Sequence, residues 1–195
     1  MQKILSVVLV LLLVTGTNSC DVLEQVGETE RFVQCDFSLN GVRVVEMGGI
    51  DLRNVNSASD LGLGDMMSLS QRFINGNLPA TLEVDVNARN SSTKVAGIAG
   101  MAWKVFLDES EFVGGQFNQS IQVFANSSTN FPIRVQVDLI KMLQSESLPK
   151  ILNLIFGMQD NTKLRELGLS VKLKPAYKTS SGAVIEFPLW ITIRP

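Results

Sequence analysis

Residues 81–89 read TLEVDVNAR, and this stretch decides the fold class. Leu82, Val84 and Val86 fall on one face of an extended chain, and polar residues fall on the other. Strict alternation of this kind is typical of a half-buried β-strand. Residues 132–139, PIRVQVDL, repeat the pattern, and so does the run AVIEFPLWITIRP at 183–195. The sequence therefore predicts a mainly β protein.

Further alternating runs lie between residues 32 and 174, and turn-forming residues such as Asn40–Gly41 separate them. Many short strands joined by short turns favour an antiparallel β-sandwich. In the last run Pro188 predicts an edge or a bulge, because proline cannot donate a hydrogen bond to a neighbouring strand. We expect the apolar residues of that run to face the core: Ile185, Phe187, Leu189, Ile191 and Ile193.

Two segments break the alternation and predict short helices. In residues 59–74 an apolar stripe follows Asp60, a suitable capping residue. In residues 138–159 Ser147 can cap a helix that Gly157 ends. We expect both helices to cover an end or an open edge of the sheet. The first stripe consists of Leu63, Met66, Met67, Phe73 and Ile74.

The chain begins with MQKILSVVLVLLLVTGTNS, residues 1–19, which has the pattern of a secretory signal peptide. Its apolar run, from Ile4 to Val14, is shorter than the roughly 20 residues that cross a bilayer. We therefore expect an exported chain with a signal peptide at 1–19, an N-terminal tether at 20–30 and a single sandwich domain at 31–195.

The charge pattern and the lack of histidine restrict the chemistry. The formal net charge is −2, and no basic patch suited to nucleic acid occurs. The absence of histidine excludes hydrolases that use an imidazole base, and it excludes histidine zinc sites. We expect no catalytic residues, no metal and no cofactor.

Two surface features remain as candidates. Asp108, Glu109 and Glu111 fall where a hairpin turn is expected, so a solvated turn is favoured over a carboxylate-based hydrolase or a calcium site. Trp190 shares its face with polar residues, which makes it a candidate contact for a partner or ligand. The alternative for Trp190 is packing beneath the second helical segment.

Residues 84–139 read VDVNARNSSTKVAGIAGMAWKVFLDESEFVGGQFNQSIQVFANSSTNFPIRVQVDL, and the chain closes with VKLKPAYKTSSGAVIEFPLWITI. Both stretches resemble the late-embryogenesis-abundant type 2 family, also called the water-stress and hypersensitive-response domain, in its bacterial exported lipoprotein version. The resemblance implies a fibronectin-III-like sandwich of about seven to nine strands with one or two short helical insertions, and no catalytic constellation. The chain departs from the family at 87–90, where Asn-Ala replaces the usual Asn-Pro.

Cys20 directly follows the apolar run and its short polar tail, and Ser19 before it suits a lipoprotein signal peptidase. The resemblance likewise implies a lipid on Cys20, which would hold the protein on a membrane of the bacterial envelope. Cleavage by an ordinary signal peptidase at the same bond would instead leave Cys20 free to pair with Cys35.

These observations favour a non-enzymatic, lipid-anchored envelope protein that serves as an interaction or protective module. The alternative is a carrier that holds an apolar ligand or lipid within the sandwich. A dry apolar cavity of several hundred Å³ would favour the carrier, and a continuously packed core would count against it.

Overall fold

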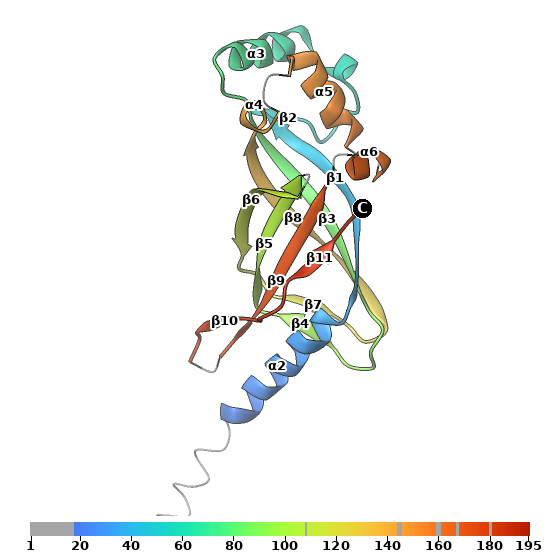
Figure 1. Cartoon of the computed structure of the whole chain (residues 1–195), viewed down its shortest axis with the longest axis vertical. Helices are drawn as coiled ribbons and strands as arrows, with labels where there is room; N and C mark the ends of the chain where they lie inside the picture. Colours follow the sequence, from blue (N-terminus) through green and yellow to red (C-terminus); the bar gives the residue numbers. More distant parts are fainter. Residues whose placement is uncertain (1–17, 108, 144–145, 159–160, 167, 180) are drawn as a thin grey trace, which may run out of the picture.

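The computed structural model describes residues 18–107, 109–143, 146–158, 161–166, 168–179 and 181–195, with side chains from residue 22 onward except that of Asn161. The chain forms a sandwich of two antiparallel sheets, which confirms the predicted mainly β fold. In Figure 1 the molecule is elongated, with short helices at one end and a single helix, α2, at the other. The signal peptide assigned to 1–19 lies mostly outside the described residues.

The first sheet has the order β2-β1-β3-β8 and contains the strands that the alternation predicted most clearly. Leu82, Val84 and Val86 of β3 are buried, and their neighbours across β8 are Val135, Ile133 and Phe131. The apolar face of each strand therefore packs inward as the pattern predicts. The strands are β1 (Asp36–Met47), β2 (Ile50–Asp51), β3 (Pro79–Asn90) and β8 (Ser127–Asp138).

The second sheet has the order β10-β9-β5-β6, and β11 also pairs with β9. Trp103 of β5 and Leu173 of β9 are opposite one another and buried in the core. A separate two-stranded ribbon, β4 with β7, lies beside α2. The strands are β4 (Ala96–Ile98), β5 (Gly100–Leu107), β6 (Ser110–Phe117), β7 (Ile121–Val123), β9 (Ser170–Lys178), β10 (Val184–Glu186) and β11 (Ile191–Ile193).

Short helices form a cap over one end of the sandwich (Figure 1). Both predicted helical segments are present, and the second starts after Ser147 and ends at Gly157 as expected. The described chain contains more helices than the one or two short helical insertions that we expected. The cap consists of the 3-10 turn η1 (Ala58–Asp60), α3 (Leu63–Ile74), α4 (Leu139–Met142), α5 (Leu148–Gly157) and α6 (Asn161–Glu166).

A further α-helix, α2 (Asn18–Val33), precedes the sandwich in the chain. It covers residues 20–30, the segment that we predicted to be a tether. Its C-terminal half is tied to the sandwich. Phe32 is fully buried and its ring lies edge-on to Phe37, with 5.3 Å between the ring centroids. Arg31 Nε donates to the carbonyl of Val95, and Thr29 Oγ1 donates to that of Gly97. We call the end formed by α2, β4, β7 and β10 the base.

Two local predictions are wrong. Asn40–Gly41 is not a turn, because β1 runs through it with a shift of register beside β3. The tight turn lies instead at Gly48–Gly49, where both residues have positive φ (57° and 85°), a conformation that glycine adopts without strain. Asp60 does not cap α3, which starts after Gly62; the carboxylate of Asp60 accepts the N–H groups of Asn56 and Ser57.

The apolar stripe predicted for α3 is correct only in part, because Met66 and Phe73 pack against the core and the other three members do not. Leu69 is the fully buried side chain, whereas Leu63, Met67 and Ile74 are 91%, 74% and 78% exposed. The helix has apolar residues on more of its circumference than the cap covers, so the pattern alone did not reveal which part packs.

Candidate functional site

Trp190 lies on the outer face of the second sheet, in the segment between β10 and β11. The predicted continuous strand is broken here by Pro188, which agrees with its expected edge or bulge position. Alternation does not carry through this run: Ile193 is buried, but Ile185, in β10 before the break, and Leu189, after it, are 43% and 55% exposed. The expectation that both of these side chains face the core is wrong.

The indole of Trp190 lies between two lysines of the neighbouring strands. Lys104 Nζ of β5 and Lys174 Nζ of β9 are 5.6 Å and 5.7 Å from the ring centroid, within the range of cation–π attraction. Each ammonium also contacts a carboxylate at 2.7 Å, Lys104 with Glu111 and Lys174 with Glu186. The ring is therefore held in place while 39% of Trp190 stays exposed. We call these five residues the Trp190 surface.

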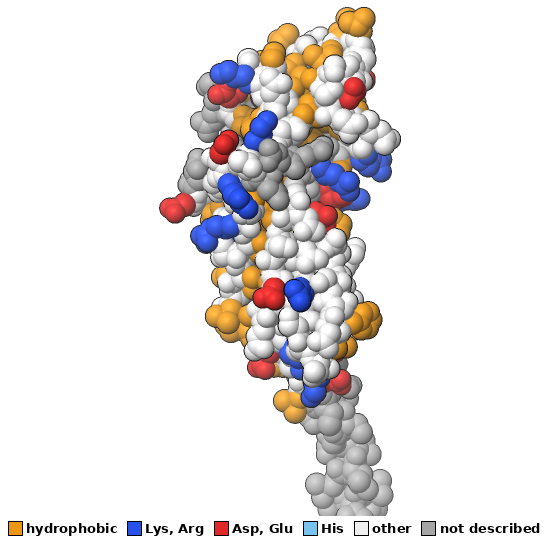
Figure 2. Space-filling view, turned by 90° about the vertical axis from the view of Figure 1, so that its right-hand side faces the viewer, with side chains coloured by type: hydrophobic (Ala, Val, Ile, Leu, Met, Phe, Trp, Pro, Cys, Tyr) orange, Lys and Arg blue, Asp and Glu red, His pale blue; other side chains and the backbone are white. Residues whose placement is uncertain are grey.

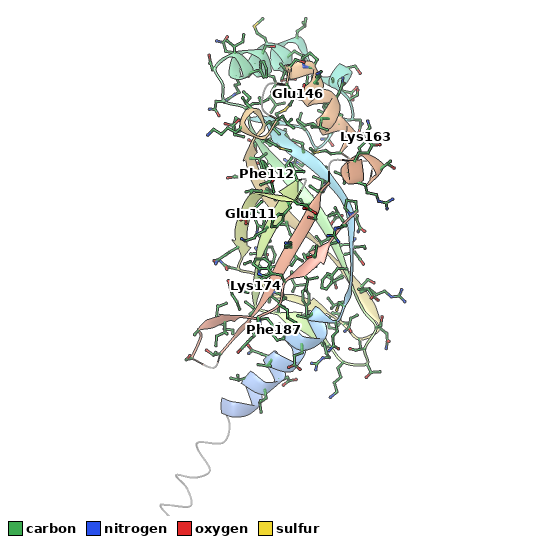
Figure 3. All side chains as sticks on the ribbon, viewed as in Figure 1. Glu111, Phe112, Glu146, Lys163, Lys174 and Phe187 are labelled. Carbon is green, nitrogen blue, oxygen red and sulfur yellow. The ribbon has the colours of Figure 1, made fainter. Side chains whose placement is uncertain are left out.

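Figure 3 places Lys174 and Phe187 in the lower half of the sandwich, above α2, and Glu111 higher on β6. The second helical segment, which we considered as a cover for Trp190, belongs to the cap at the other end of the molecule (Figure 1). Trp190 thus contacts lysine side chains of the sheet, and its exposed area is available to a partner. Glu111, from the predicted acidic turn, forms an ion pair with Lys104. Asp108 lies outside the described residues.

Cys20, the second predicted site residue, lies in the first turn of α2, and its side chain is outside the described part of the structure. Cys35 is a free, buried thiol whose Sγ is 3.5 Å from the carbonyl oxygen of Arg31. Burial, together with the nearby charge of Asp36, raises the pKa of the Cys35 thiol to about 11. The thiol of Cys35 is therefore protonated and unreactive at neutral pH.

A charge cluster on the outer face of the first sheet escaped the sequence analysis. Glu83 of β3 is the one buried charged residue in the described part of the chain. Its Oε1 accepts from Nε and the terminal nitrogen of Arg43 on β1, and its Oε2 accepts from Arg134 Nε on β8 at 3.4 Å. Alternation places all three residues on outward faces, but only the register of three strands brings them together.

These hydrogen bonds and charges, that of Arg43 foremost, lower the pKa of Glu83. A lowered carboxyl pKa stabilises the fold above the unfolded value of about 4.3, and this contribution is lost as pH falls through the lower folded-state pKa. We expect Glu83→Gln to reduce the unfolding free energy at pH 7 by about 1–3 kcal/mol. Urea unfolding as a function of pH measures this, and the gap between wild type and variant should close in acid. A gap that is constant with pH would contradict the assignment.

The buried apolar side chains of the described residues form one connected core between the sheets. One small apolar cavity, about 20 Å³, lies where the cap meets the sandwich. This volume is close to that of a single water-sized probe and far below the roughly 300–1,000 Å³ of typical ligand sites. A carrier would therefore have to displace the cap to hold a ligand. The cavity wall includes Val42, Val84, Phe112, Met142, Met158 and Leu164.

Other described features point to no metal site and no spanning helix. No group of three or more Cys, Asp or Glu side chains in the described residues is placed to hold a metal ion. None of the described helices has the length and hydropathy needed to span a membrane. On the face shown in Figure 2, basic and acidic side chains are interspersed among uncharged ones.

No family model matches the chain, and no curated protein matches it. Solved structures with remote likeness include a protein from Archaeoglobus fulgidus, with 13% identity over 58% of this chain and 82% of that one, at a TM-score of 0.31. The putative ApaA protein from Bordetella pertussis is 10% identical over 82% and 94% of the two chains, at a TM-score of 0.33. A Northeast Structural Genomics Consortium target is 6% identical over 83% of this chain and 86% of that one, at a TM-score of 0.35. Likenesses this remote say nothing about what the chain binds.

Proposed function

We propose that the protein is a non-enzymatic module of the bacterial envelope, similar to exported type 2 late-embryogenesis-abundant lipoproteins and held on a membrane by a lipid on Cys20. The observation that carries this proposal is the position of Cys20. It lies in the first turn of α2, whose other end is fixed to the sandwich by Phe32, Arg31 and Thr29. A lipid there would hold the whole sandwich at its base and direct the cap away from the membrane (Figure 1).

Two features favour an interaction or protective role: the small volume of the internal cavity and the exposed Trp190 surface. Among the described residues, the apolar cavity between cap and sandwich holds only about 20 Å³, too little for a ligand. The Trp190 surface is a fixed, partly exposed aromatic group. Aromatic side chains held in this way contribute large contact area at low entropic cost. We therefore favour the interaction module over the carrier.

Metabolic labelling with a fatty-acid analogue, followed by membrane fractionation, tests the proposal. Wild type is expected to carry label and to sediment with membranes, whereas Cys20→Ala should lose both, because no other residue would hold the lipid. Cys35→Ala is the matched control, since it removes the other cysteine of the chain, and it should keep the label. Equal label in wild type and Cys20→Ala, or label in neither, would remove the lipoprotein proposal.

A further inference from the structure

Exposed apolar side chains gather on the β9–β10 hairpin at the base. Val184 and Ile185 of β10 are 61% and 43% exposed. The turn that joins the two strands is short, with Thr179 N–H donating to the carbonyl of Ala183 at 2.8 Å. Large apolar side chains exposed on a protruding element commonly mark contacts with a protein or a membrane.

This hairpin lies directly beside α2. Val184 is opposite Lys178 in the strand pairing, and Lys178 N–H donates to Gln25 Oε1 of α2 at 3.2 Å. Gln25 follows Cys20 by five residues, which is about 8 Å along an α-helix. Between them Leu23 is 72% exposed. The apolar end of the hairpin is therefore within about one and a half helical turns of the residue that we propose to be lipidated.

We propose that Leu23 and the β9–β10 hairpin form a second contact with the membrane. The hairpin would enter the boundary between headgroups and acyl chains end-on, because Val184 and Ile185 are consecutive in β10 and point to opposite faces of the strand. The occupant follows from the proposed lipid on Cys20, on which this inference rests. Leu23 is three residues from Cys20, about 4.5 Å of helical rise, and the hairpin is hydrogen-bonded to the same helix at Gln25, so a membrane that receives the lipid lies next to both. Apolar side chains of peripheral proteins enter such a boundary to a depth of about 5–10 Å. Such a contact would fix the tilt of the sandwich on the membrane.

The charges around this contact are mixed. Lys178 on the hairpin is exposed, but Glu24 on α2 and Glu186 at the end of β10 are exposed as well. Attraction to anionic lipid is therefore not the source of binding, and neutral phosphatidylcholine should be sufficient. A similar exposed apolar pair on α3, Leu63 and Met67, lies one helical turn apart in the cap at the opposite end of the molecule (Figure 1) and supplies a matched control.

The test uses the full lipidated protein reconstituted into phosphatidylcholine vesicles. Ile185→Cys and Leu63→Cys variants are each labelled with a nitrobenzoxadiazole fluorophore. The lipid occupies Cys20, and Cys35 is buried with its pKa raised to about 11, so labelling is confined to the new thiol. In vesicles with brominated acyl chains, emission from position 185 should fall by about half, because only a group at the acyl-chain boundary meets the quencher. Emission from position 63 should be unchanged.

Each other result has a defined meaning. If the protein floats with the vesicles but position 185 is not quenched, the lipid anchor stands and the second contact is overturned. Quenching at both positions would also overturn it, because the sandwich would then lie flat. If the protein does not float, lipid attachment at Cys20 fails, and this contact fails with it.

Discussion

Replacing Trp103 with alanine is expected to reduce the unfolding free energy by about 3–5 kcal/mol, the usual cost of deleting a buried large aromatic side chain. Trp103 lies in the middle of the second sheet, 7% exposed, between Gly115 of β6 and Leu173 of β9. A Cβ at position 115 would lie 2.5 Å from Trp103 Cζ2, so the ring rests directly on the glycine backbone. Urea unfolding followed by circular dichroism measures the loss.

Trp190→Ala is the matched control, because it deletes the same side chain from the outer face of the same sheet. We expect it to cost about 1–2 kcal/mol, which corresponds to partial burial and two cation–π contacts. Gly115→Ala should also destabilise the fold, since its new methyl group would displace the indole of Trp103. Equal losses for Trp103→Ala and Trp190→Ala would contradict the packing described here.

Phe32→Ala is expected to reduce the unfolding free energy by about 3–5 kcal/mol and to loosen α2. Phe32 is fully buried, with Phe37 and Phe131 at ring-centroid distances of 5.3 Å and 6.4 Å. These contacts tie the C-terminal half of α2 to both β1 and β8. Hydrogen exchange should show faster exchange of the α2 amides in the variant, alongside the loss in global stability.

Leu23→Ala supplies the control on the same helix, because Leu23 is 72% exposed. Its effect on stability should lie within about 0.5 kcal/mol, as is usual for surface substitutions. If Phe32→Ala left the exchange of α2 unchanged, α2 would not depend on this contact. The hydrogen bonds of Arg31 and Thr29 would then be what fixes α2 to the sandwich.

The fold class was accessible from the sequence because β3 and β8 alternate without interruption. Leu82, Val84 and Ile133 follow the predicted inward face. Alternation failed at 183–195 for two reasons: Pro188 interrupts the strand, and Ile185, which precedes it, lies in β10 at the base, beyond the core between the sheets (Figure 1).

Other features depend on contacts between distant segments and could not be predicted. Arg43, Glu83 and Arg134 are separated by 40 and 51 positions, and only the strand register makes them one cluster. The segment 20–30 has a weakly amphipathic pattern, so its helix is visible only once Phe32 and Arg31 contact the sandwich. Which side chains of α3 are buried likewise depends on its contacts with the rest of the cap, so the burial of Leu69 and the exposure of Leu63 could not be predicted. The partial exposure of Trp190 was predicted, because it shares a strand face with polar residues. Its contacts with Lys104 and Lys174 were not predicted.

The central claim is that a lipid on Cys20 attaches the base of the sandwich to a membrane. Mass spectrometry of the N-terminal peptide of the mature protein tests it most directly. The account predicts a chain that begins at Cys20 with fatty-acyl mass on that residue, together with a Cys35-containing peptide that is an unmodified thiol. An N-terminal Cys20 without lipid, or a disulfide between Cys20 and Cys35, would contradict it.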